Sequence, residues 1–190
     1  MSRLWLTGYR SYELGIWGND DKKLKVIKFA LKNYLISRIE DGVDWLISGG
    51  QLGTEQWSIE VGLELKAEYP ELQVAMMLPF AQFGSNWKED KQAALATLES
   101  RVDFTDSVTN APYQSPQQLR NYQEFMLSHT DEAALVYDLD MPGKPKYDYD
   151  AAHRFSEEHN YPVVLIDMDW LQESASEYAE QENLKRDSQF

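Results

Sequence analysis

The stretch 46-LISGGQLGTEQW-57 holds three glycines within five residues, too many for the middle of a regular element. The run that ends at Ser48 is short, apolar and compatible with a strand. Trp57, Val61 and Leu65 then recur at four-residue spacing, as on one face of a helix. The glycines therefore mark a strand-to-helix junction, where the first helical N–H groups lack partners and the helix dipole is positive. Such a junction favours an anion, often a phosphate.

The rest of the chain repeats this alternation of short apolar runs and amphipathic stretches. It predicts an α/β fold, a Rossmann-like three-layer sandwich with a mainly parallel sheet and helices on both faces. We expect one domain over residues 1–175, then an acidic polar tail over 176–190 that forms a fraying last helix. The strands are expected at residues 3–7, 43–48, 73–78, 104–108, 133–138 and 163–167.

Two of the expected helices carry start signals. Ser115 is the expected N-cap of a helix in which Gln118 reaches back and Leu119 is buried. Another helix is expected to begin at Asn86, with Glu89 completing a similar capping box.

Composition narrows the function classes. A formal net charge of −14 without a basic block makes nucleic acid an unfavourable partner. The absence of cysteine excludes disulfides, thiolate metal sites and cysteine nucleophiles, and the three histidines lack ligand spacing, so no metal site is expected. The start has no signal-peptide pattern, and no run approaches the ~20 apolar residues of a membrane span. We expect a soluble cytoplasmic protein without membrane contact.

Ligands of open parallel sheets bind outside the carboxyl ends of the strands, which directs attention to the loops there. After the first strand, Gly8 allows a tight exit, Tyr9 follows it, and Arg10 offers a bidentate anion clamp. Further along, Asn121 supplies a polar group, and the segment 143-GKPKY-147 brings two lysines, Lys144 and Lys146, as phosphate contacts on a rim.

The glycine turn itself offers backbone to a ligand. Gly49 and Gly50 let the chain turn, and Gly53 brings the helix start close, with Gln51 and Thr54 beside them. Neither G-x-G-x-x-G nor G-x-x-x-x-G-K-[ST] is matched. The alternative is a tight turn that holds no ligand.

Glu55 and two tryptophans complete the candidate site. The Glu55 carboxylate either serves the helix dipole, accepts hydrogen bonds from ribose hydroxyls, or acts as general acid or base if burial raises its pKa. Trp57 and Trp87 belong to the core or stack on a nucleobase. We expect the phosphate end at Gly8, Arg10, Gly50, Gly53 and Thr54, with sugar and base toward Glu55, Trp57 and Trp87.

Five motifs, in order and spacing, resemble the YpsA family of Gram-positive bacteria over residues 5–168: "TGYRSYELGIW", "SGGQLGTEQW", "PF" followed by "NW", "SPQQ", and "YD" followed by "GKPKY". The resemblance implies membership of the Rossmann-like SLOG superfamily, whose distant relatives include DNA-processing protein A and the LOG phosphoribohydrolases. It implies a nucleotide or nucleotide-derived ligand and a link to cell division, with no settled reaction. The family's motif residues fall on Gly53, Glu55, Trp57 and Trp87.

One departure bears on the chemistry. The P-G-G-x-G-T-x-x-E motif of the phosphoribohydrolases is missing, since the corresponding region reads 141-MPGKPKYDYD-150, and Glu55 remains the catalytic candidate. The leading hypothesis is a cytoplasmic sensor of an ADP-ribose-like or other nucleotide ligand that signals to protein partners such as cell-division proteins. The alternatives are a nucleotide hydrolase or phosphoribohydrolase acting through Glu55, and a protein-interaction module with a vestigial crevice. No cofactor beyond the nucleotide is expected, and self-association into a homo-oligomer is left open.

Overall fold

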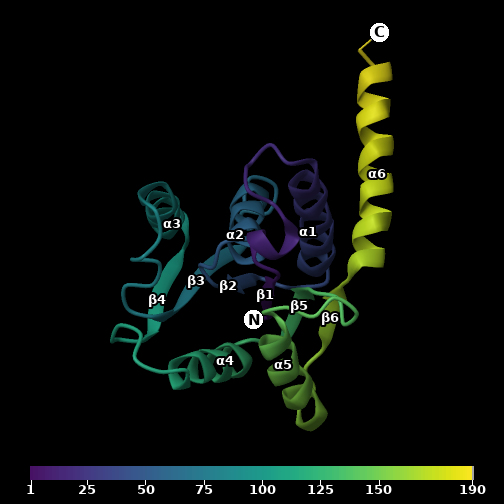
Figure 1. Cartoon of the computed structure of the whole chain (residues 1–190). Coiled ribbons are helices and arrows are strands. Elements are labelled where there is room, and N and C mark those ends of the chain that lie inside the picture. Colours follow the sequence, from purple (N-terminus) through teal and green to yellow (C-terminus); the bar gives the residue numbers. More distant parts are fainter. Residues whose placement is uncertain (190) are drawn as a thin grey trace.

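The computed structural model describes residues 1–189 and contains a six-stranded parallel sheet in the order β4-β3-β2-β1-β5-β6 (Figure 1). The strands are β1 (Arg3–Gly8), β2 (Trp45–Ser48), β3 (Gln73–Phe80), β4 (Phe104–Thr109), β5 (Glu132–Val136) and β6 (Val163–Ile166). The helices are η1 (Ser11–Leu14), α1 (Lys22–Glu40), α2 (Thr54–Leu65), α3 (Glu89–Arg101), α4 (Gln117–His129), α5 (Lys146–Glu158) and α6 (Met168–Asp187). The predicted Rossmann-like α/β fold is confirmed.

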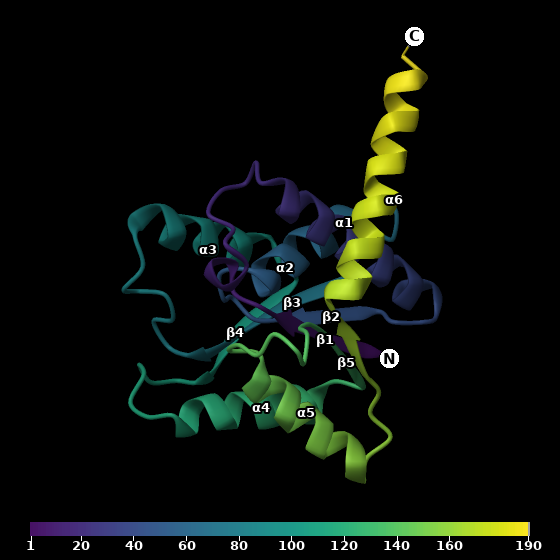
Figure 2. The ribbon, with the colours of Figure 1, turned by 45° about the vertical axis from the view of Figure 1, so that its right-hand side comes forward.

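Helices cover both faces of the sheet. α1, α2 and α3 lie on one face, and α4 and α5 lie on the other (Figure 2). The central strands are therefore buried on both sides: Leu4, Trp5 and Leu6 of β1 are fully inaccessible to solvent. Strands buried on both faces have continuous apolar sequences instead of alternating ones, and for this reason the sequence predicts them well.

The sheet order places the topological switch point between β1 and β5. From β1 the chain adds β2, β3 and β4 in one direction, then returns to place β5 on the other side of β1. The loops after β1 and β5 therefore diverge at the carboxyl edge, where a ligand crevice is expected. Gly8, at the end of β1, allows β1 and β5 to approach closely, since a Cβ there would lie 2.6 Å from the Val136 carbonyl oxygen.

Two expected helix starts need correction. α4 has Pro116 as its N-cap; Gln118 does reach back, accepting the Ser115 N–H at 3.0 Å, but Leu119 is 44% exposed. The buried stripe runs through Gln118 and Tyr122 at four-residue spacing, so Leu119 falls beside it. α3 begins at Glu89 and not at Asn86, because the chain up to Trp87 is a turn in which the Trp87 N–H donates to the Gly84 carbonyl.

The last helix is longer than the sequence indicated. α6 stays helical as far as Asp187, within the segment expected as a tail. It packs on α1 as far as Tyr178, whose ring contacts Phe29 edge to face at 5.5 Å between ring centroids. Its second half projects from the body, and Leu184 is exposed (Figures 1 and 2). Within residues 1–189, none of the helices has the length and apolar character needed to span a membrane.

Candidate functional site

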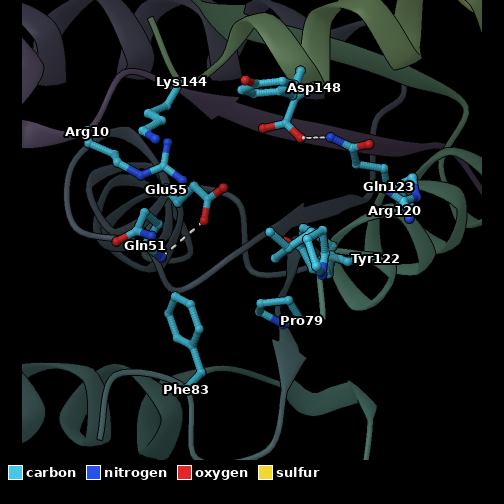
Figure 3. Close-up of a pocket in the computed structure, with 13 residues that line it drawn as sticks. Arg10, Gln51, Glu55, Pro79, Phe83, Arg120, Tyr122, Gln123, Lys144 and Asp148 are labelled. Carbon is cyan, nitrogen blue, oxygen red and sulfur yellow. Dashed lines mark hydrogen bonds between the residues drawn. The ribbon is translucent and has the colours of Figure 1, made fainter. Parts of the chain in front are cut away.

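A cavity of about 420 Å³ opens at the carboxyl edge of the sheet, in the crevice that the strand order provides (Figure 3). Five segments line it: the loops after β1 and β2, the end of β3 with the turn that follows, α4, and the loop after β5 with the start of α5. Its charged side chains are Arg10, Glu55, Arg120, Lys144 and Asp148.

Glu55 projects from the first turn of α2 into this cavity. Its Oε1 accepts the Gln51 N–H at 3.0 Å and its Oε2 accepts the Thr7 hydroxyl at 2.8 Å. Burial raises the pKa of Glu55, while these hydrogen bonds and the charge of Arg10 act in the opposite direction. A Cβ on Gly49 would overlap the Glu55 carboxylate, so the bare backbone makes room for this side chain.

Asp148 and Tyr122 face the same space from the other side. Asp148 comes from the first turn of α5 and accepts a hydrogen bond from Gln123 Nε2 at 2.8 Å. Burial, assisted by the nearby Glu55 carboxylate, raises the pKa of Asp148 to about 6. The Tyr122 hydroxyl is buried and has no hydrogen-bond partner within the described chain. These three groups can accept hydrogen bonds from ligand hydroxyls or donate hydrogen bonds to them. Asp148, with its pKa of about 6, can also exchange a proton near neutral pH.

Two cations lie at one end of the cavity. The side chains of Arg10 and Lys144 point toward the same region, beside Glu55 (Figure 3). Across residues 1–189, neither has a carboxylate within 4.0 Å, whereas Lys146 is paired with Asp150 at 2.6 Å and does not line the cavity. Arg10 and Lys144 are thus two positive charges free of carboxylates at this end of the cavity. The third cation of the lining, Arg120 of α4, also lacks a carboxylate partner among the described residues and donates a hydrogen bond to Gln117 Oε1 at 2.8 Å.

The end of the cavity away from Arg10 and Lys144 is mainly apolar, with Arg120 of α4 as its charged residue (Figure 3). Pro79, Phe83, Pro116 and Leu119 line it, and half-exposed Leu119 leaves it open to solvent. Trp87 supports this end from behind, because its ring contacts the Phe83 ring edge to face at 5.2 Å between centroids. Phe83 and Leu119 therefore offer flat apolar surface to a ring.

The start of α2 is occupied by the chain itself. The backbone N–H of Thr54 donates to the Tyr9 carbonyl at 3.1 Å, and the Thr54 hydroxyl donates to the same oxygen at 2.8 Å. Gly53 has φ +115°, and a Cβ there would lie 2.5 Å from the Ser11 nitrogen. These two residues thus hold the loop after β1 against the helix start, and Thr54 is buried.

The remaining predicted residues lie outside the cavity lining. Gly50 faces the side chains of Leu78 and Leu95, and the Tyr9 hydroxyl donates to the Met141 carbonyl. Trp57 is buried in the core, and Asn121 accepts a hydrogen bond from Gln117 at the exposed face of α4. The predicted residues that the structure brings together in the cavity are Arg10, Gln51, Glu55 and Lys144.

The sequence reading missed Tyr122, Gln123 and Asp148. Tyr122 lies on the buried stripe of α4, and its four-residue spacing from Gln118 indicates packing rather than a ligand site. The sequence signal for Asp148 is the acidic pattern 148-DYD-150, which directly follows the two lysines after the fifth strand. Only the packing of α4 beside α5 shows that these groups meet Glu55.

Comparison with known proteins gives a consistent family. A family model described as the YspA SLOG family, YpsA, matches residues 4–171. The chain is 67% identical over 190 residues to a UPF0398 protein of Levilactobacillus brevis, with full coverage of both chains. It is 66% identical over 183 residues to one of Lactiplantibacillus plantarum, covering 96% of this chain and 97% of the relative. With the match extending from β1 into α6, the chain belongs to the YpsA family of SLOG proteins.

Proposed function

We propose that this protein binds a nucleotide or nucleotide-derived small molecule, of the ADP-ribose kind, in the cavity at the carboxyl edge of its sheet. The observation that carries this proposal is the separation of chemistry along the cavity. Arg10 and Lys144 lie at one end and two carboxylates and a hydroxyl in the middle, while the remaining lining is mainly apolar and carries one further cation, Arg120 (Figure 3). A nucleotide has the same sequence of parts: phosphate, sugar and base.

Each part of a nucleotide has a matching group in the cavity. Arg10 and Lys144 attract the phosphate. Glu55 and Asp148 accept hydrogen bonds from sugar hydroxyls, and Tyr122 offers a hydroxyl without a partner among the described residues. The base lies against the apolar end. The volume of about 420 Å³ falls in the range of small-molecule sites.

We further propose that ligand occupancy is signalled to a protein partner, with cell division as the process that the family resemblance suggests. The mouth of the cavity supports a contact of this kind. Tyr147, which lines the cavity, is 70% exposed, and Leu139 and Met141 of the preceding loop are also more than half exposed. Exposed apolar side chains in one neighbourhood are typical of surfaces that bind other proteins.

A second candidate function has its own observation. Glu55 and Asp148 are two carboxyl groups of raised pKa that face one cavity, an arrangement that suits general acid–base catalysis. On this proposal the protein is a nucleotide hydrolase or phosphoribohydrolase, with Glu55 and Asp148 dividing the roles of base and acid.

One experiment separates these functions. The purified chain is incubated with adenosine, AMP, ADP and ADP-ribose, while thermal unfolding, calorimetric binding and the composition of the solution are followed. A ligand that raises the unfolding temperature and is recovered intact supports the sensor. Product that forms with the wild type and not with Glu55→Gln supports the hydrolase. If none of the four compounds binds at millimolar concentration, both nucleotide functions are overturned.

A further inference from the structure

Glu13 connects the two loops that carry Arg10 and Lys144. It lies in η1, and its Oε2 accepts the backbone N–H of Arg10 at 2.8 Å. Its Oε1 accepts the backbone N–H of Lys144 at 2.7 Å. One carboxylate thus ties the loop after β1 to the loop after β5, across the switch point of the sheet.

Gly143, beside Lys144, leaves room for the Glu13 carboxylate because it has no side chain. A Cβ on Gly143 would lie 2.5 Å from Glu13 Oε1 and 3.4 Å from the Tyr9 ring. The glycine therefore lets the loop after β5 approach Glu13 closely enough for the hydrogen bond. Glu13 does not line the cavity itself.

We infer that Glu13 is a positioning residue that holds Arg10 and Lys144 as a pair, so that the cavity recognises a phosphate group by two cations at once. This inference rests on the proposed function and deepens it by naming the subsite. We call the two hydrogen bonds of Glu13 the clamp. Without it, the loops that carry Arg10 and Lys144 are no longer tied together by this carboxylate. Binding an anion between them then requires both loops to be ordered at that moment, which weakens the affinity.

Charge balance supports the pairing. Two cations that point toward the same region repel each other, and the partly buried Glu13 carboxylate behind their backbones offsets that repulsion. Because Glu13 is bonded to backbone N–H groups, it leaves both cationic side chains available to a ligand. A phosphate group can contact both cationic side chains at once, whereas an uncharged nucleoside has no charge for them to bind.

The test is a double-mutant cycle read by calorimetry with ADP and adenosine. Glu13→Gln keeps the size of the side chain but turns one acceptor into a donor that faces a backbone N–H. We expect it to weaken ADP roughly tenfold and leave adenosine unchanged. In an Arg10→Ala, Lys144→Ala background, the same substitution should have no effect on residual ADP binding. Glu64→Gln, an exposed carboxylate of α2, is the matched control and should change neither affinity.

The outcomes are distinct. If the wild type binds ADP and Glu13→Gln binds it equally well, the clamp is overturned while the proposed function stands. If Glu13→Gln weakens adenosine and ADP alike, or acts equally in the Arg10→Ala, Lys144→Ala background, Glu13 only supports the local fold and the inference is again overturned. If the wild type binds none of the nucleotides, the proposed function itself fails. Urea unfolding of each variant shows whether the fold persists.

Discussion

Glu55 and Tyr122 meet at the bare Cα of Gly49: a Cβ there would overlap the Glu55 carboxylate and lie 2.7 Å from the Tyr122 hydroxyl oxygen. The first glycine of the junction is therefore kept free of a side chain by two side chains of the protein. Both groups line the cavity, so the candidate site depends on residue 49 having no side chain.

The glycines of the junction should differ in their tolerance of alanine. Gly49→Ala displaces two side chains, and we expect it to lower the free energy of unfolding by about 1–3 kcal/mol. Gly53→Ala should lower it by more, because its neighbours are backbone atoms that cannot move aside and its φ of +115° disfavours any side chain. Urea unfolding measures both. Gly18→Ala, with no atom within 4 Å of the added Cβ, is the control. Equal stability of all three variants would contradict the packing described here.

Asp148 should make stability depend on pH. Its folded pKa of about 6 lies above the unfolded value of about 4, so the folded state holds the proton more tightly. This contribution is fully present below pH ~4 and is lost as the pH rises through about 6. Asp148→Asn removes it while keeping an oxygen for Gln123. Relative to wild type, the variant should therefore gain stability on the order of 2 kcal/mol between pH 4 and 7.

Urea unfolding at pH 4, 5.5 and 7 checks this difference, with Asp140→Asn, an exposed aspartate of the loop after β5, as control. A difference between Asp148→Asn and wild type that does not vary with pH would show that burial does not raise this pKa.

Substitutions at the two ends of the cavity should change the affinities for nucleotides and nucleosides differently. Arg10→Ala should weaken ADP and AMP by about 1.5–3 kcal/mol, the value of a charge-assisted hydrogen bond, and leave adenosine almost unchanged. Phe83→Ala should weaken all three alike. Trp87→Ala should follow Phe83→Ala with a smaller loss, because Trp87 acts through its contact with the Phe83 ring. If Arg10→Ala weakens adenosine as much as ADP in calorimetry, the placement of the phosphate at this end is wrong.

The C-terminal helix should tolerate truncation up to a definite point. A chain ending at residue 182 keeps the contact between Tyr178 and Phe29 and should unfold within about 0.5 kcal/mol of the full chain. A chain ending at residue 175 loses that contact and should be about 1–2 kcal/mol less stable. Thermal and urea unfolding of both chains test this. A large loss for the longer chain would show that the projecting half of α6 contributes to the fold.

The sequence by itself determined the layered α/β architecture and most strand positions. This was possible because the central strands are buried on both faces, so that runs such as 133-AALV-136 are apolar without interruption. It also identified Arg10, Gln51, Glu55 and Lys144, because ligands bind at the carboxyl ends of parallel strands and these residues lie in the loops there. Hydrophobic periodicity is a local property of each segment, so one sequence is enough to show it.

Only the tertiary structure decided what the glycines face and which groups join Glu55. The sequence reading gave Gly53 to a phosphate, whereas the bare side of Gly53 is in contact with the backbone of the loop after β1. Tyr122 and Asp148 enter the site from helices that lie far from Glu55 in the chain. The sequence pattern of a segment indicates which of its residues are buried, but not which distant segment packs against them. That choice is made by close packing of the whole chain, where a single Cβ decides whether two segments can touch.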